Sequence, residues 1–136
     1  MIRGLLLALG VVLLFAGCGK SGTKLPVSEM TARTDANGVQ TVDVEAHSFY
    51  FKPNRVVVDR DKPVDLVIHF KSWFAPHNFT CVDQDAGISA SVSAGAMSFG
   101  KTRHVKFTPT RSGEYEFFCH VDGHAKKGMK GTIVVR

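Results

Sequence analysis

The chain has 136 residues, three cysteines and a formal net charge of +5, and 44% of its residues are hydrophobic. This length suits one domain with a hydrophobic core. The positive charge is mild and the arginines do not form a cluster, which argues against nucleic acid as a partner. The cysteines do not have the spacing of a disulfide framework.

The first residues have the pattern of a secretory signal. Met1 to Arg3 supply one basic residue, an apolar run extends from Leu5 to Ala16, and Gly17 follows it. A basic start, an apolar stretch and a small-residue stop are typical of an export signal. The apolar run is shorter than the ~20 residues that a transmembrane helix needs. We therefore expect residues 1–17 to be a signal peptide and the protein to reach the periplasm or the outer cell surface.

A lipid attachment site is predicted directly after this signal. The stretch Ala16-Gly17-Cys18 resembles a bacterial lipobox, although Phe15 departs from the usual Leu or Val. In such proteins the cysteine becomes the mature N-terminus and receives lipid, and several acyl chains together hold a protein at a membrane. We expect lipidated Cys18 to begin a polar tether over residues 18–39. The alternative is a plain secreted protein with an incidental cysteine in its signal.

The sequence has a period of two from Thr41 to the end, with turn residues between short apolar runs. This pattern is typical of strands, and regularly spaced strands indicate an all-β antiparallel sandwich of about seven or eight strands over residues 40–136. Residues 83–100, which are rich in Gly, Ala and Ser, are expected to form a loop. The predicted strands after the first are Arg55 to Val58, Val64 to Phe70, His77 to Val82, Arg103 to Phe107, Gly113 to Cys119 and Gly131 to Val135.

A metal-binding pattern lies near the C-terminus. Cys119, His124 and Met129 have Cys-x4-His-x4-Met spacing, and His77 lies upstream in the stretch Pro-His-Asn-Phe. Two imidazoles, a thiolate and a thioether are the ligands of a blue-copper electron-transfer site, in which the Met is a weak axial ligand. Zinc is the main rival because His and Cys also suit it, whereas the soft thioether favours one copper ion.

The sequence excludes one further alternative and leaves two open. A binuclear copper site would need a second cysteine on the loop, and Gly123 occupies that place. His120, beside Cys119, is expected to point to solvent, and the alternative is that it joins or replaces a ligand. Cys81 is expected to be a small buried hydrophobe, and the alternative is a Cys81–Cys119 disulfide, which would destroy the copper site.

These residues resemble the cupredoxin family of small blue-copper proteins. The resemblance covers nearly all of the chain from Val42 to Arg136, and the ligand loop is similar to those of azurin, auracyanin and rusticyanin. It implies a Greek-key β-sandwich with copper ligands at His77, Cys119, His124 and Met129. It also implies that Asn78 joins the two ligand loops by hydrogen bonds and that the exposed edge of His124 is the electron port. His120 is unusual for the family, and lysines replace what is often an apolar surface beside the port.

The function predicted from these features is that of an electron carrier rather than an enzyme. The protein is expected to be a monomer that moves single electrons between periplasmic or membrane-associated redox proteins, such as cytochromes or oxidases. Lys126, Lys127 and Lys130 would form a docking rim around His124 for an acidic partner, or they are only a solvated face. The alternatives are a protein that delivers copper and a copper enzyme with a site modified by His120.

Overall fold

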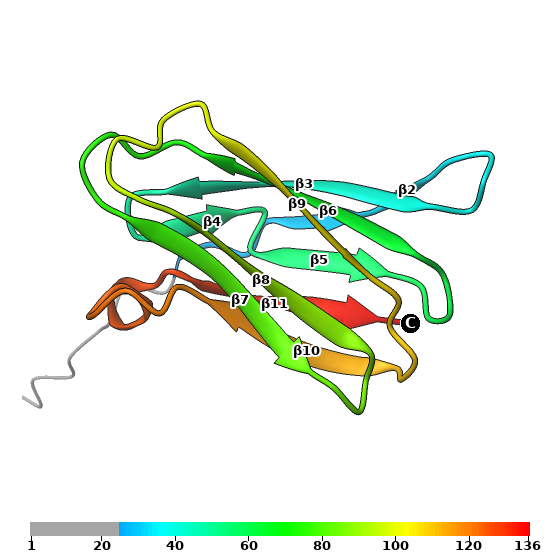
Figure 1. Cartoon of the computed structure of the whole chain (residues 1–136). Helices are drawn as coiled ribbons and strands as arrows, with labels where there is room; N and C mark the ends of the chain where they lie inside the picture. Colours follow the sequence, from blue (N-terminus) through cyan, green and yellow to red (C-terminus); the bar gives the residue numbers. More distant parts are fainter. Residues whose placement is uncertain (1–24) are drawn as a thin grey trace, which may run out of the picture.

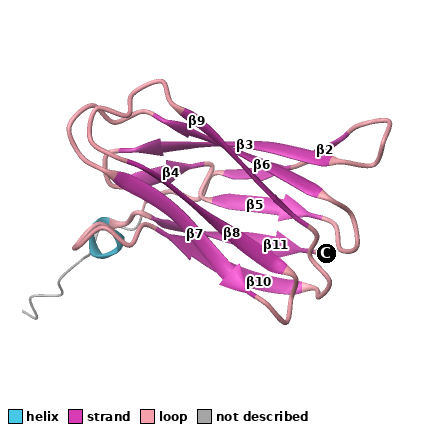
Figure 2. Ribbon diagram, viewed as in Figure 1, coloured by secondary structure: helices cyan, strands magenta, loops and turns pink. Residues whose placement is uncertain are grey.

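The computed structural model describes residues 25–136, in which two β-sheets pack face to face (Figure 1). The predicted signal peptide and the lipidation site at Cys18 lie outside these residues. Nearly all regular structure is strand, and a single turn of 3-10 helix, Ala125–Lys127, lies at one end of the sandwich (Figure 2). Within residues 25–136, no helix has the length and apolar character needed to cross a bilayer.

Eleven strands make up the described part of the chain. They are β1 (Glu29–Thr31), β2 (Arg33–Thr34), β3 (Gln40–His47), β4 (Tyr50–Lys52), β5 (Arg55–Val58), β6 (Val64–Phe70), β7 (His77–Asp83), β8 (Ile88–Ala94), β9 (Thr102–Phe107), β10 (Gly113–Phe118) and β11 (Lys130–Val135).

The strands form two mixed sheets. One sheet has the order β1-β5-β11-β10-β7-β8, and the other has the order β2-β3-β6-β9 with β4 paired to β3. The pairs β1–β5, β5–β11 and β3–β6 are parallel, and the other pairs are antiparallel. The predicted all-β sandwich is confirmed, with parallel neighbours where chain crossovers bring distant strands together.

Every second side chain along the strands points inward, and these side chains fill the space between the sheets. Every second residue of β3 is buried, from Gln40 to Ala46, and the intervening residues are half-buried. At the end of the core next to the predicted metal loop, the rings of Phe51, Phe79 and Phe117 pack together with centroids 4.6–5.6 Å apart. Since Phe79 is two residues after His77 and Phe117 two before Cys119, this aromatic cluster fixes both strands just below the predicted ligands.

Two segments differ from what the sequence led us to expect. Residues 83–100 contain a full strand, β8, where a loop was predicted, so that prediction is wrong. Ile88, Ala90 and Ala94 are buried and alternate with serines, but small apolar residues gave only a weak period-two signal. The described end of the predicted tether also includes β1 and β2, which pair with β5 and β3.

Candidate metal centre

The structure places the four predicted ligands at one end of the sandwich, on two separate segments. His77 is the first residue of β7, Cys119 directly follows β10, His124 precedes the 3-10 helix and Met129 directly precedes β11. All four are buried, and His124 is the most exposed of them at 7%. Three of the four ligands therefore lie on the short connection between β10 and β11.

His77, Cys119 and His124 form one cluster. One potential ligand atom from each side chain lies within 4.8 Å of the other two. The Sγ atom of Cys119 is 3.6 Å from Nδ1 of His124, and the two imidazole centroids are 5.0 Å apart. This spacing matches three ligands arranged around a common centre.

Backbone hydrogen bonds hold Met129 next to Cys119 and His124. The N–H of Cys119 donates to the carbonyl of Met129 at 3.0 Å, and the N–H of Met129 donates to the carbonyl of His124 at 3.1 Å. Gly128, at φ 110°, makes the left-handed turn that ends the 3-10 helix just before it. This conformation favours glycine, which explains the Gly-Met sequence at this point of the loop.

The imidazole of His77 is buried without a polar partner in the described part of the chain. Both of its ring nitrogens are buried and neither has a hydrogen-bond partner among residues 25–136. Burial, with a smaller contribution from His124, lowers the pKa of His77 to about 4. A buried polar group without a partner is unfavourable, and a neutral imidazole is the form that binds metal. The cluster that contains His77 is therefore suited to a metal ion.

His124 is also held in the neutral form. Burial lowers its pKa, Lys127 lowers it further, and Asp122 opposes the change. Together with a thiol and a buried thioether, the two neutral imidazoles form a set of soft and borderline donors. The residues present fit one copper ion.

Asn78 connects the two ligand segments by hydrogen bonds. Its side-chain oxygen accepts the backbone N–H of His120 at 2.6 Å, and its own backbone N–H donates to Sγ of Cys119 at 3.4 Å. A hydrogen bond to the sulfur of a potential ligand helps to orient it. Asn78 thus contacts Cys119 directly and fixes the residue that follows it.

The remaining candidates lie outside the cluster. His120 is exposed, and its ring lies 4.4 Å from that of Phe118. Cys81 and Cys119 are both free and buried, and burial raises the pKa of the Cys81 thiol to about 12. The disulfide alternative therefore finds no support in the structure. Met97, in the loop after β8, is 74% exposed.

One residue that was not among the predicted site residues contacts the site. Phe49, in the turn between β3 and β4, lies edge-to-face against His124 with ring centroids 4.9 Å apart. Lys127 lies over the same phenyl ring, with Nζ 4.1 Å from its centroid. No local pattern in the sequence indicates these contacts, because they depend on how the hairpin packs against the ligand loop.

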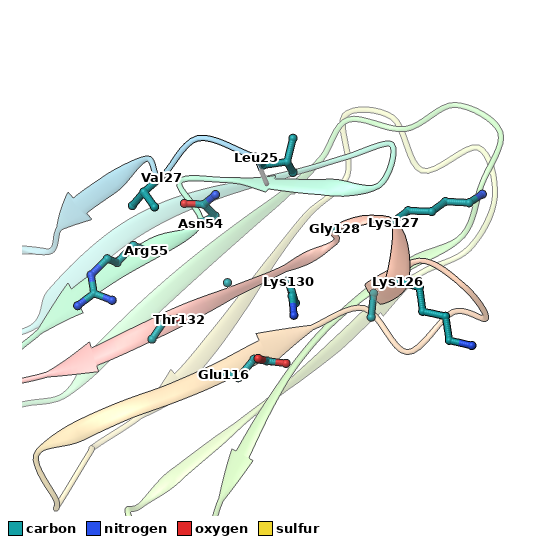
Figure 3. Close-up of a pocket in the computed structure, with 12 residues that line it drawn as sticks. Leu25, Val27, Asn54, Arg55, Glu116, Lys126, Lys127, Gly128, Lys130 and Thr132 are labelled. Carbon is teal, nitrogen blue, oxygen red and sulfur yellow. The ribbon is translucent and has the colours of Figure 1, made fainter. Parts of the chain in front are cut away.

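An open groove lies beside the ligand loop without reaching the cluster. It runs past the 3-10 helix and across the outer face of β5, β10 and β11, with Lys126, Lys130 and Glu116 among its side chains (Figure 3). None of the four predicted ligands lines this groove. The buried cluster is therefore separated from it.

The chain matches the model of the cupredoxin-like domain over residues 6–135. It therefore belongs to the cupredoxin-like family, and the predicted family membership is confirmed. A search of curated proteins finds no match.

Solved structures with the same fold include several copper proteins. Reduced auracyanin from the photosynthetic bacterium Roseiflexus castenholzii is 17% identical, with a TM-score of 0.60 over 77% of this chain and 98% of that one. The metal-binding domain of the Streptococcus pneumoniae Cu(I)-exporting P-type ATPase CopA, solved with Cu(I), is 19% identical, with a TM-score of 0.59 over 82% and 98%. Auracyanin A, a blue copper protein from Chloroflexus aurantiacus, is 20% identical, with a TM-score of 0.58 over 73% and 100%.

Proposed function

We propose that this protein is a single-electron carrier whose copper ion is held by His77, Cys119, His124 and Met129. The observation on which this rests is the buried imidazole of His77, whose two nitrogens lack partners within residues 25–136 while its ring lies beside Cys119 and His124. A bound copper ion would supply a one-electron couple, and two imidazoles, a thiolate and a thioether are donors that suit such a site.

The protein's part is to keep the ligands in place and to exclude water. Cys119 and Met129 are joined by a backbone hydrogen bond, and Asn78 connects β7 to the residue after Cys119. His77 lies on a strand of the sandwich, above the packed rings of Phe79 and Phe117. A ligand set anchored in this way has little freedom to rearrange, and this favours rapid electron transfer over ligand exchange.

The burial of the site favours an electron carrier over an enzyme. Cys119 and His77 are each 1% exposed, Met129 is fully buried, and the nearby groove is not lined by the cluster. A substrate would need access to the reacting centre, and His120 lies exposed outside the cluster. This arrangement supports electron transfer through the edge of the His124 ring, because His124 is the most exposed of the four ligands.

A role in copper delivery is the second candidate. It is favoured by the likeness to the CopA metal-binding domain, which was solved with Cu(I). The two functions differ in how firmly copper is held. An electron carrier should keep its copper during dialysis against a moderate chelator and show a reversible one-electron wave in voltammetry. Rapid loss of copper to the chelator, without a reversible wave, would favour delivery.

We further propose an acidic redox protein, such as a cytochrome or an oxidase, as the partner. Lys126, Lys127 and Lys130 are exposed on the ligand loop after His124 and at the start of β11, and a rim of such charges would accelerate association with an acidic surface. Reversal of Lys126 and Lys130 to glutamate, which leaves the contact of Lys127 with Phe49 in place, should slow electron exchange with an acidic cytochrome at low salt, and the difference should shrink at high salt. An unchanged rate would contradict the docking rim.

The cellular location proposed is the periplasm or the outer cell surface, with the protein anchored through lipidated Cys18. The support is the sequence pattern of residues 1–18, with its apolar run and lipobox-like end. Mass spectrometry of the protein isolated from membranes should show an N-terminal acylated Cys18. A mature N-terminus elsewhere, without lipid, would contradict the anchor.

A further inference from the structure

His124 has few contacts that fix its side chain. It precedes a 3-10 helix on the ligand loop, and its only side-chain hydrogen-bond contact within residues 25–136 is with Cys119 Sγ at 3.6 Å. His77, by contrast, begins a strand that pairs with both β8 and β10. The orientation of the His124 ring therefore depends on the rings packed beside it, His77 and Phe49.

Phe49 reaches His124 from a strained backbone position. It lies in the two-residue turn that joins β3 to β4, and its φ is 70°. Positive φ at this position of a tight turn favours Gly or Asn, and it is an outlier for a bulky side chain. Such a conformation persists only where the surrounding structure requires it, and such positions gather at functional sites.

The ring of Phe49 contacts two residues of the ligand loop. Its ring is perpendicular to that of His124, at an interplanar angle of 89°, and Lys127 lies over it at 4.1 Å. A cation over an aromatic face is attracted by the ring. Lys127 is itself tied to the loop because its N–H donates to the carbonyls of Gly123 and His124. Phe49 is therefore bound to the same short segment that presents His124.

We propose that Phe49 is a positioning residue that holds the His124 imidazole in one orientation, and that the strained turn exists to present its ring. This inference rests on the proposed function, in which His124 is a copper ligand. The role is distinct from core packing, because Phe49 is half-buried and lies at the rim of the site. It also gives Lys127 a structural task beyond a solvated surface charge.

The test compares Phe49→Gly, Phe49→Leu and Phe49→Tyr in the metal-free protein. Asp61→Gly is the matched control, because Asp61 also has positive φ, at 59°, in the turn between β5 and β6. The orientation of the His124 ring is followed by NMR of its ring protons, and thermal unfolding is measured in parallel. Phe49→Gly should keep or raise the melting temperature while the His124 ring becomes mobile. Phe49→Tyr should retain the wild-type ring signals, and Phe49→Leu should lose them.

The Asp61→Gly control and measurements on the copper-loaded protein distinguish the possible outcomes. Asp61→Gly should relieve the same kind of strain and leave the His124 signals unchanged. In copper-loaded protein, Phe49→Gly and Phe49→Leu should shift the reduction potential and Phe49→Tyr should restore it. An unchanged His124 ring in Phe49→Gly, or a ring equally disturbed in Asp61→Gly, would overturn the positioning role. Failure of the wild type to bind copper would instead overturn the proposed function, while the metal-free result on Phe49 would stand.

Discussion

The side-chain oxygen of Asn78 accepts the backbone N–H of His120 at 2.6 Å and so connects β7 to the residue that follows Cys119. The two residues are 42 positions apart in the sequence. Because the N–H of Asn78 also donates to Cys119 Sγ, one residue sets the distance between the segment of His77 and the segment of the other three ligands. The geometry of the cluster therefore depends on Asn78 even without metal.

Replacement of Asn78 by alanine should destabilise the metal-free protein by about 0.5–1.5 kcal/mol, the net contribution of a typical hydrogen bond. Urea unfolding measures this change, and Asn37→Ala is the control because Asn37 is an exposed turn residue. The copper-loaded variant should also show an altered absorption spectrum, since the backbone around Cys119 is less constrained. A loss of stability no larger than in Asn37→Ala would show that the connection is unimportant.

Replacement of His77 by leucine should stabilise the metal-free protein. Both nitrogens of His77 are buried without partners among residues 25–136, and such a group costs about 1–3 kcal/mol. Leucine removes that cost, but it also removes a ligand, so added copper should no longer raise the melting temperature as it does for the wild type.

His69→Leu is the matched control for this experiment. His69 contacts Asp43 and Thr102 through its two ring nitrogens, so the substitution should not stabilise the protein. It should also leave the effect of copper unchanged. A metal-free His77→Leu protein that is less stable than the wild type would mean that His77 is satisfied by groups of the protein itself.

Replacement of Gly131 by alanine should destabilise the protein by about 1–3 kcal/mol, as overpacking of a core does. A Cβ atom at this position of β11 would collide with the ring of Phe117 and with the carbonyl of Asn54. Gly95→Ala is the control, since a Cβ there would meet no atom within 4 Å. Denaturant unfolding should separate the two variants clearly, and equal stability would contradict the close approach of β11 to Phe117.

The sequence predicted the strands in which apolar and polar residues alternate clearly. It missed the strands in which this alternation is weak. The bounds predicted for the strands Arg55–Val58 and Val64–Phe70 agree with β5 and β6, because large apolar residues mark their buried faces. Strand β8 was missed because alanines and serines differ little in polarity. The short strands β1 and β2 have exposed residues throughout, so no hydrophobic pattern could indicate them.

The candidate site was predictable to the extent that its residues are close in sequence. Cys119, His124 and Met129 have a spacing that a loop between two strands brings together, and the structure buries all three. His77 is more than 40 positions away, and its place in the cluster follows from the antiparallel pairing of β7 with β10. Phe49 could not be predicted, because its contact with His124 depends on a turn conformation that phenylalanine rarely adopts.

The most direct test is the visible absorption spectrum of the protein after addition of Cu(II) and removal of the excess, compared with that of Cys119→Ser. A copper ion held by the thiolate of Cys119 and the imidazoles of His77 and His124 should give an intense visible band. A reductant should bleach the band, an oxidant should restore it, and Cys119→Ser should lack it. A wild-type protein that stays colourless, or that has the same weak spectrum as Cys119→Ser, would contradict the copper-thiolate site and the electron-carrier function with it.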